Sequence, residues 1–161
     1  MLRELIEACR ATLGSRHPNT LASIGNLGTL LNDKGDLAAA EPLLREALEA
    51  GRATLGGRHP DVLRDIGNFA DLLLEQGRAD GAFATLDDAA EVACEVLGPQ
   101  HLITLVIDAK AALIAYARGE GATALAAAVA RMKAMLGAAH RVTTRYAAVL
   151  VELSVTWSLS K

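Results

Sequence analysis

Apolar residues along the chain recur at steps of three and four positions, which is the spacing of one face of a helix. Two equivalent stripes show this spacing: Ile24, Leu27, Gly28 and Leu31, and Ile66, Phe69, Ala70 and Leu73. Ala and Leu supply most of the apolar residues, and both favour helices because they lose little freedom there. Runs of β-branched residues in strict alternation are missing, so a β-sheet has little to build on. The pattern therefore predicts an all-α fold.

The helical stripes belong to a repeat. Glycine follows leucine at positions 14, 56, 98 and 137, which gives successive spacings of 42, 42 and 39. Two further ladders share the longer period: Gly35, Gly77 and Gly119, and Ala40, Ala82 and Ala124. Residues 2–18 also match residues 44–60 at 13 of 17 positions. Because ladders in phase do not arise by chance, we predict a stack of repeated helix pairs, an α-solenoid.

Each period predicts where helices end and begin. The Leu-Gly pair ends a helix, since glycine tolerates the positive φ that follows a last turn, and we expect this φ at Gly56. The following His-Pro pair opens the next helix, with proline in the first helical position. A second glycine, as in Gly35 and Gly77, makes a tight turn between paired helices. Helices are expected over residues 1–12, 18–34, 36–54, 60–76, 78–96, 102–118, 121–135 and 141–159.

These helices predict one repeat domain over residues 1–161, with about eight helices. Residues 1–12 form a half repeat, which is followed by repeats over 13–54, 55–96 and 97–135. The last repeat is expected to lack about one turn of its second helix, because its glycine spacing is 39 instead of 42. Residues 136–161 contain a terminal helix. End repeats are often atypical, because they cap the stack.

Composition and charge change the picture mainly by excluding partners. The net charge is −3 and Lys and Arg form no block, so a nucleic-acid surface, which needs clustered cations, is not expected. The most apolar stretch, residues 146–153, is too short to cross a bilayer, so no membrane insertion is expected. Cys9 and Cys94 lack CxxC spacing and are interpreted as small apolar fillers of a reduced protein. These features predict a cytoplasmic protein, and a removed targeting leader stays open.

The repeat resembles tetratricopeptide repeats, and in particular the longer form of the repeat found in kinesin light chains. The matching segments are residues 24–28 (IGNLG), 35–43 (GDLAAAEPL), 46–48 (EAL) and 55–60 (LGGRHP). The resemblance covers almost all of the chain and fades after residue 100, where Leu102 replaces the proline. It implies a right-handed superhelix of antiparallel helix pairs whose first helices line a concave groove. It also implies a scaffold or adaptor that binds other proteins.

The resemblance places the binding residues on the first helix of each pair. Asn26, Asn68 and Lys110 are separated by one full period each and would form a row along the groove. An amide there can both donate and accept hydrogen bonds along an extended peptide. The alternative is that each side chain braces the neighbouring helix. The flanking candidates for the peptide-binding groove are Thr29, Asp71, Arg64, Asp33 and Glu75.

Four histidines recur once per repeat, at positions 17, 59, 101 and 140. Successive members of this ladder would be about 8–10 Å apart, whereas a zinc ion needs ligand nitrogens about 2 Å away. We therefore interpret them as residues that start helices, and we expect no metal and no cofactor. Phosphate-binding loops and nucleophile elbows are also missing from the sequence, so an enzyme is not expected.

Two functions stay open. The first is an adaptor that binds a peptide or protein segment in its concave groove. The second is a structural subunit of a larger assembly, which docks or self-associates through the apolar helix over residues 141–159. One stripe of that helix would pack onto the repeat, leaving a second stripe for another polypeptide, because a row of apolar side chains is rarely left in water. That second stripe is Ala147, Val151, Val155 and Leu159.

Overall fold

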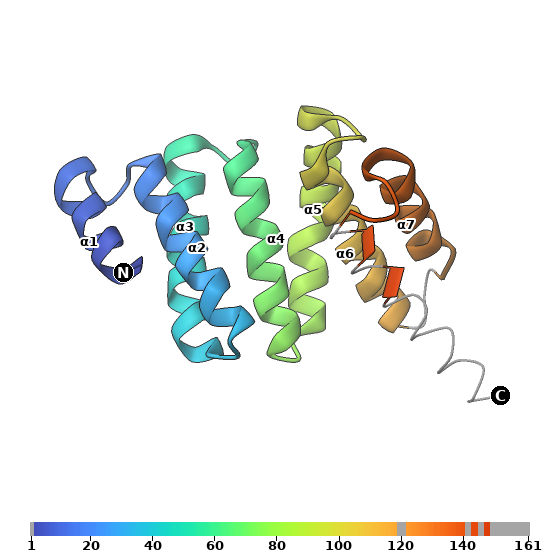
Figure 1. Ribbon diagram of the computed structural model, residues 1–161, viewed down its shortest axis with the longest axis horizontal. Helices are drawn as coiled ribbons and strands as arrows, with labels where there is room; N and C mark the ends of the chain where they lie inside the picture. Colours follow the sequence, from blue (N-terminus) through green and yellow to red (C-terminus); the bar gives the residue numbers. More distant parts are fainter. Residues whose placement is uncertain (1, 119–121, 141–142, 145–146, 149–161) are drawn as a thin grey trace.

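The protein is a row of antiparallel helices. The computed structural model describes residues 2–118, 122–140, 143–144 and 147–148. Over these residues it contains seven helices and no strand. The helices are α1 (Leu2–Leu13), α2 (Pro18–Asp33), α3 (Leu37–Leu55), α4 (Pro60–Glu75), α5 (Ala79–Leu97), α6 (Leu102–Ala117) and α7 (Ala122–Leu136). Figure 1 shows them stacked in chain order, with α1 at one end and α7 at the other.

Each observed helix begins and ends within one residue of its predicted range, so the all-α prediction is confirmed. The second helix of the last repeat, α7, has 15 residues where α3 and α5 have 19, in line with the shorter glycine spacing there. The eighth predicted helix, over residues 141–159, lies mainly outside the described residues. Within the described ranges, none of the helices combines the length and apolar character that a membrane crossing requires.

The helices form an inner layer of α2, α4 and α6 and an outer layer of α1, α3, α5 and α7. Successive inner helices touch directly, α2 with α4 and α4 with α6. On the outer side, a cavity of about 400 Å³ separates α3 from α5 and is floored by Leu63, Ile66 and Phe69 of α4. A stack whose helices approach more closely on one side curves towards that side. The inner layer therefore forms the concave face.

Small residues let each inner helix pack closely on its outer partner. Leu44 of α3 is 1% exposed and lies against Gly28 of α2. A Cβ atom placed on Gly28 would lie 2.7 Å from Leu44 Cγ, which is closer than nonbonded carbons allow. Ala70 of α4 takes the equivalent position and is fully buried. The predicted core is confirmed, because both predicted stripes are buried or half-buried.

Two kinds of glycine turn connect the helices. After α2, the N–H of Asp36 donates to Leu31 O and the N–H of Gly35 donates to Asn32 O, each at 2.9 Å. These paired bonds are those of a Schellman turn. After α3, Gly56 has a φ of 85° and a ψ of 153°. The predicted positive φ is confirmed, but ψ is extended, which places Gly56 in a backbone region that is essentially restricted to glycine.

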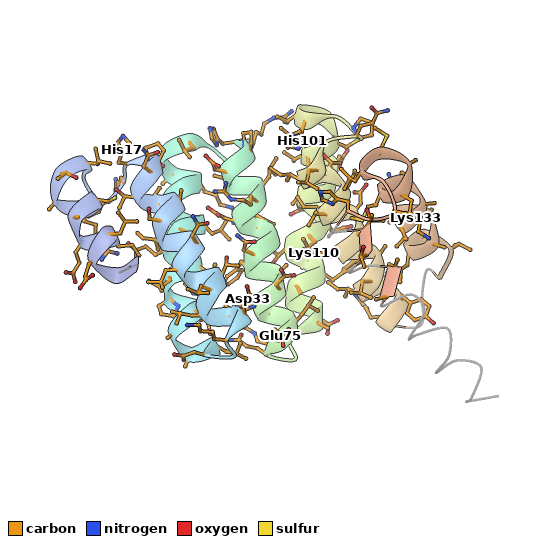
Figure 2. The ribbon with its side chains drawn as sticks, in the orientation of Figure 1. His17, Asp33, Glu75, His101, Lys110 and Lys133 are labelled. Carbon is orange, nitrogen blue, oxygen red and sulfur yellow. The ribbon has the colours of Figure 1, made fainter. Side chains whose placement is uncertain are left out.

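Histidine side chains cap the inner helices. His17 Nδ1 accepts a hydrogen bond from the N–H of Asn19 at 3.2 Å, and His59 and His101 make the same bond to the residue two positions later. Each bond satisfies one of the N–H groups that a helix start leaves without a partner. His17 and His101 lie along the same edge of the stack, where the inner helices begin (Figure 2). The predicted role as helix-start residues is confirmed for these three histidines.

We predict that Gly56→Ala lowers the free energy of unfolding by about 1–3 kcal/mol, because alanine is strained at this backbone conformation. Space is not limiting, since nothing lies within 4 Å of the added Cβ. Thermal or urea unfolding measures the loss. Gly57→Ala is the matched control, because Gly57 has equally open surroundings without a positive φ. Equal stability of the two variants would contradict the assignment of strain to Gly56.

A second prediction concerns the histidine cap. Replacing His59 by Ala removes the acceptor for the N–H of Asp61 and should lower the free energy of unfolding by about 1 kcal/mol. Replacing it by Asn should retain most of the stability, because asparagine is among the best capping residues. Chemical unfolding of both variants at neutral pH tests this. If the two variants lose the same stability, the side chain does not act as a cap.

Candidate functional site

The inner helices present two asparagines on the concave face. Asn26 of α2 is exposed and Asn68 of α4 is half-buried. Within the part of the chain that the structure describes, neither side-chain amide has a hydrogen-bond partner. Bracing of the neighbouring helix, the alternative to groove binding, would use such bonds. Both amides are therefore available to a ligand, and their role in binding stays a prediction.

Lys110 of α6 differs from the asparagines at the equivalent positions. It is only 6% exposed, and its Nζ donates to Gly67 O and to Asp71 Oδ2, each at 2.8 Å. These bonds join α6 to α4, which is the bracing alternative described for this row. Lys110 is labelled in Figure 2. Peptide binding by Lys110 or Asp71 stays a prediction, and it would have to compete with this ion pair.

Two flanking candidates also have partners within the chain. Thr29 Oγ1 donates to Gly25 O one turn earlier in α2, at 3.0 Å. Arg64 Nη1 lies 2.9 Å from Asp61 Oδ1 on the same face of α4. Because the Arg64 side chain is still 41% exposed, it can exchange this contact for another. Neither contact tests a role in binding.

The remaining two candidates are acidic and lie at helix ends. Asp33 is the last residue of α2 and Glu75 is the last residue of α4. Figure 2 shows both along the edge of the stack where the inner helices end, opposite to the edge with His17 and His101. The structure therefore separates them from the asparagines along the helix axes, and it places negative charge along this edge of the inner layer.

Sequence reasoning missed a buried carboxylate. Asp65 of α4 is 4% exposed, and its Oδ1 has no hydrogen-bond partner among the described residues. Arg64 is a nearby cation, but its Nε lies 3.8 Å from that oxygen, too far for a hydrogen bond. Burial raises the pKa of the Asp65 carboxyl to about 6, while Arg64 opposes the rise and Asp61 adds to it. Buried charges usually have a partner, so this carboxylate requires an explanation.

The repeat contains the signal that could have found Asp65. The positions one period before and after it hold Ser23 and Ile107, and Ile107 is 1% exposed. The position therefore faces a neighbouring helix, and an apolar side chain fills it well. The signal is a carboxylate at a position where the next repeat has a buried isoleucine.

Asp108, a half-buried acid, shows how a buried carboxylate is usually neutralised. Asp108 of α6 lies 3.0 Å from Arg131 Nη2 of α7. Burial raises the pKa of the Asp108 carboxyl, and the Arg131 guanidinium opposes that rise. Asp108 thus has a strong ion-pair partner on the next helix, whereas Asp65 has none at hydrogen-bonding distance in the described structure.

The capping histidines and the acidic side chains are the residues that could coordinate a metal ion. Over the described residues, no group of His, Cys, Asp or Glu side chains has an arrangement that could hold a metal ion. Three of the histidines use Nδ1 as the acceptor of a backbone N–H bond, as described above.

The predicted docking stripe is described at one position. Ala147 is half-buried and packs against the apolar cluster of α6 and α7, which includes Leu105, Leu125 and Met132. Part of the Ala147 side chain thus meets the repeat, and docking through this stripe stays a prediction. Val151, Val155 and Leu159 lie outside the described residues.

Comparison with known families agrees with the repeated helix pairs. The tetratricopeptide-repeat family matches residues 1–53 and 20–95, which together span more than half of the chain. The chain belongs to the tetratricopeptide-repeat family. A search of curated proteins found no match.

Solved structures show the same tetratricopeptide fold. A putative kinesin light chain from Podosopora anserina, with nearly identical repeats, is 24% identical, with a TM-score of 0.67 over 82% of this chain. BtubC (BKLC) from P. vanneervenii is 16% identical, with a TM-score of 0.69 over 87% of this chain. The chain spans 64% of the first protein's length and 55% of the second's. The resemblance to kinesin light chain-like repeats is confirmed at the level of fold.

The tetratricopeptide repeat does not need the charge on Asp65, and this generates a prediction. The folded pKa of about 6 lies above the ordinary value of 3.8, so folding disfavours the ionised form. The destabilisation of the folded protein by ionised Asp65 is absent below about pH 4 and complete above about pH 6. The stability of Asp65→Asn relative to the wild type should therefore rise by about 2–3 kcal/mol between pH 4 and pH 7. Urea unfolding across this range measures the difference.

The pH dependence separates charge from the other effects of the substitution, because an uncharged amide contributes equally at each pH. Asp87→Asn is the control, since Asp87 of α5 is exposed and its removal changes the net charge equally. A difference between Asp65→Asn and wild type that does not vary with pH would contradict the raised pKa.

Proposed function

We propose that this chain binds an extended segment of another protein along the concave face formed by α2, α4 and α6. The coarser statement, that it is a protein-interaction scaffold, follows from its family. The observation that carries the finer proposal is the pair of asparagines. Asn26 and Asn68 lie at equivalent positions of adjacent inner helices, and neither amide has a hydrogen-bond partner among the described residues.

The spacing of the inner helices suits such a ligand. An amide offers a donor and an acceptor, so it matches the N–H and C=O groups of an extended backbone. Adjacent packed helices lie about 8–10 Å apart, and an extended chain advances about 3.3 Å per residue. Asn26 and Asn68 would therefore contact backbone groups about three residues apart. Thr29, Arg64, Asp33 and Glu75 would contribute to side-chain preference rather than to backbone recognition.

The proposal includes no catalysis, because tetratricopeptide repeats are a family of non-enzymatic scaffolds. A cytoplasmic location is part of the proposal, and the free thiols of Cys9 and Cys94 support it. The second candidate function, a structural subunit that docks through residues 141–159, has less support. Its one described stripe residue, Ala147, packs inwards.

A random peptide library, panned against the immobilised protein, tests the groove. Peptides selected by the wild type should bind the double variant Asn26→Ala/Asn68→Ala at least about tenfold more weakly, because each backbone contact loses its partner. The control is Gln100→Ala, which removes an exposed amide from the loop between α5 and α6. Fluorescence anisotropy measures the dissociation constants. Equal binding by all three proteins would contradict groove binding.

A further inference from the structure

Two side chains of opposite charge occupy equivalent places in successive interfaces of the inner layer. A Cβ built on Gly25 of α2 would lie 3.3 Å from Asp65 Oδ1 of α4. A Cβ built on Gly67 of α4 would lie 3.4 Å from Lys110 Nζ of α6. Gly25 and Gly67 are separated by one full period, so they are the same position of the repeat. Each interface therefore has a charged atom placed against the glycine of the preceding inner helix.

Only one of these two charges has a hydrogen-bonded partner of opposite charge within the described structure. Between α4 and α6, Lys110 Nζ is held by Gly67 O and by the carboxylate of Asp71. Between α2 and α4, the positions equivalent to Asp71 and Lys110 are Thr29 and Asn68, which are uncharged. Asp65 Oδ1 is left without a hydrogen-bond donor in the described structure. The first interface thus has an anion where the second has a complete ion pair.

Arg64 does not complete the pair. Its Nε lies 3.8 Å from Asp65 Oδ1, and its Nη1 is closer to Asp61, at 2.9 Å. The Arg64 side chain is 41% exposed, and its shorter contact is the one with Asp61. Stability does not explain the carboxylate either, because Ile107 fills the equivalent position with 1% exposure. A buried charge that the fold does not need, and that its one nearby cation does not hydrogen-bond, is a candidate ligand site.

We infer that the α2–α4 interface receives a cationic side chain, Lys or Arg, from the segment bound in the groove, with Asp65 Oδ1 as its acceptor. This inference rests on the proposed groove binding and adds a preference for one basic residue. The α4–α6 interface supplies the precedent, since an ammonium group already lies against Gly67 in the equivalent place. Asp33 and Glu75, on the same two inner helices, add negative charge that favours a basic segment.

Selection from a random peptide library tests the inference, with wild type and Asp65→Asn panned in parallel. Peptides enriched by the wild type should share a Lys or Arg at one fixed position, and peptides enriched by Asp65→Asn should lack this preference. A selected peptide and its analogue with Gln at that position are then titrated against both proteins. Asp65→Asn should weaken the basic peptide at least about tenfold and leave the Gln analogue within about twofold.

Two comparisons make each outcome decisive. Asp87→Asn changes the net charge equally from the exposed face of α5 and should bind both peptides like the wild type. Thermal unfolding of Asp65→Asn shows that weaker binding comes from a folded protein. Enriched peptides without a fixed basic residue, or a basic preference that survives in Asp65→Asn, would overturn the inference and leave groove binding intact. If no peptide prefers the wild type over Asn26→Ala/Asn68→Ala, groove binding itself fails, and the inference fails with it.

Discussion

The close approach of each inner helix to its outer partner is the constraint on which the other features depend. Gly28 leaves room for Leu44 at a separation that even a methyl group would obstruct. This packing holds the two helices of a pair together, while the inner helices of successive pairs touch and a cavity separates α3 from α5 on the outer side. The concave face, its row of equivalent positions and the nesting of charged groups against glycines all follow from that geometry.

The sequence was sufficient to predict the helices, the turns and the core, because these depend on local rules that recur in every period. Ladders of glycine, alanine and His-Pro specify where each helix ends, and the structure follows them within one residue. The capping bond of His17 was not foreseen, since histidine is not among the usual capping residues. The extended ψ of Gly56 was missed for a similar reason, because glycine permits several conformations at positive φ.

The candidate site was less predictable than the fold. Periodicity places Asn26, Asn68 and Lys110 in one row, but it does not say whether a side chain reaches the neighbouring helix. That depends on side-chain length and on the distance between helices, and Lys110 is long enough to reach Gly67 O. Asp65 was missed because its signal, the isoleucine one period later at position 107, shows only when the two repeats are compared position by position. Identity below 25% to the solved structures conveys the fold and not the ligand.

The buried Lys110 bridge has a mechanical consequence. It joins α4 to α6 through an ion pair and a hydrogen bond to a backbone carbonyl. The interface between α2 and α4 instead contains Asp65, whose Oδ1 has no hydrogen-bond donor in the described structure, and a cavity lies on the outer side of α4. A stack joined in this way is not uniformly stiff, because bending concentrates at the interface with the weaker inner bond. We therefore expect the part of the protein from α4 onwards to bend less than the junction between α2 and α4. The curvature of the solenoid then depends on each interface separately. A ligand that bridges α2 and α4 would also fix the angle between these two helices.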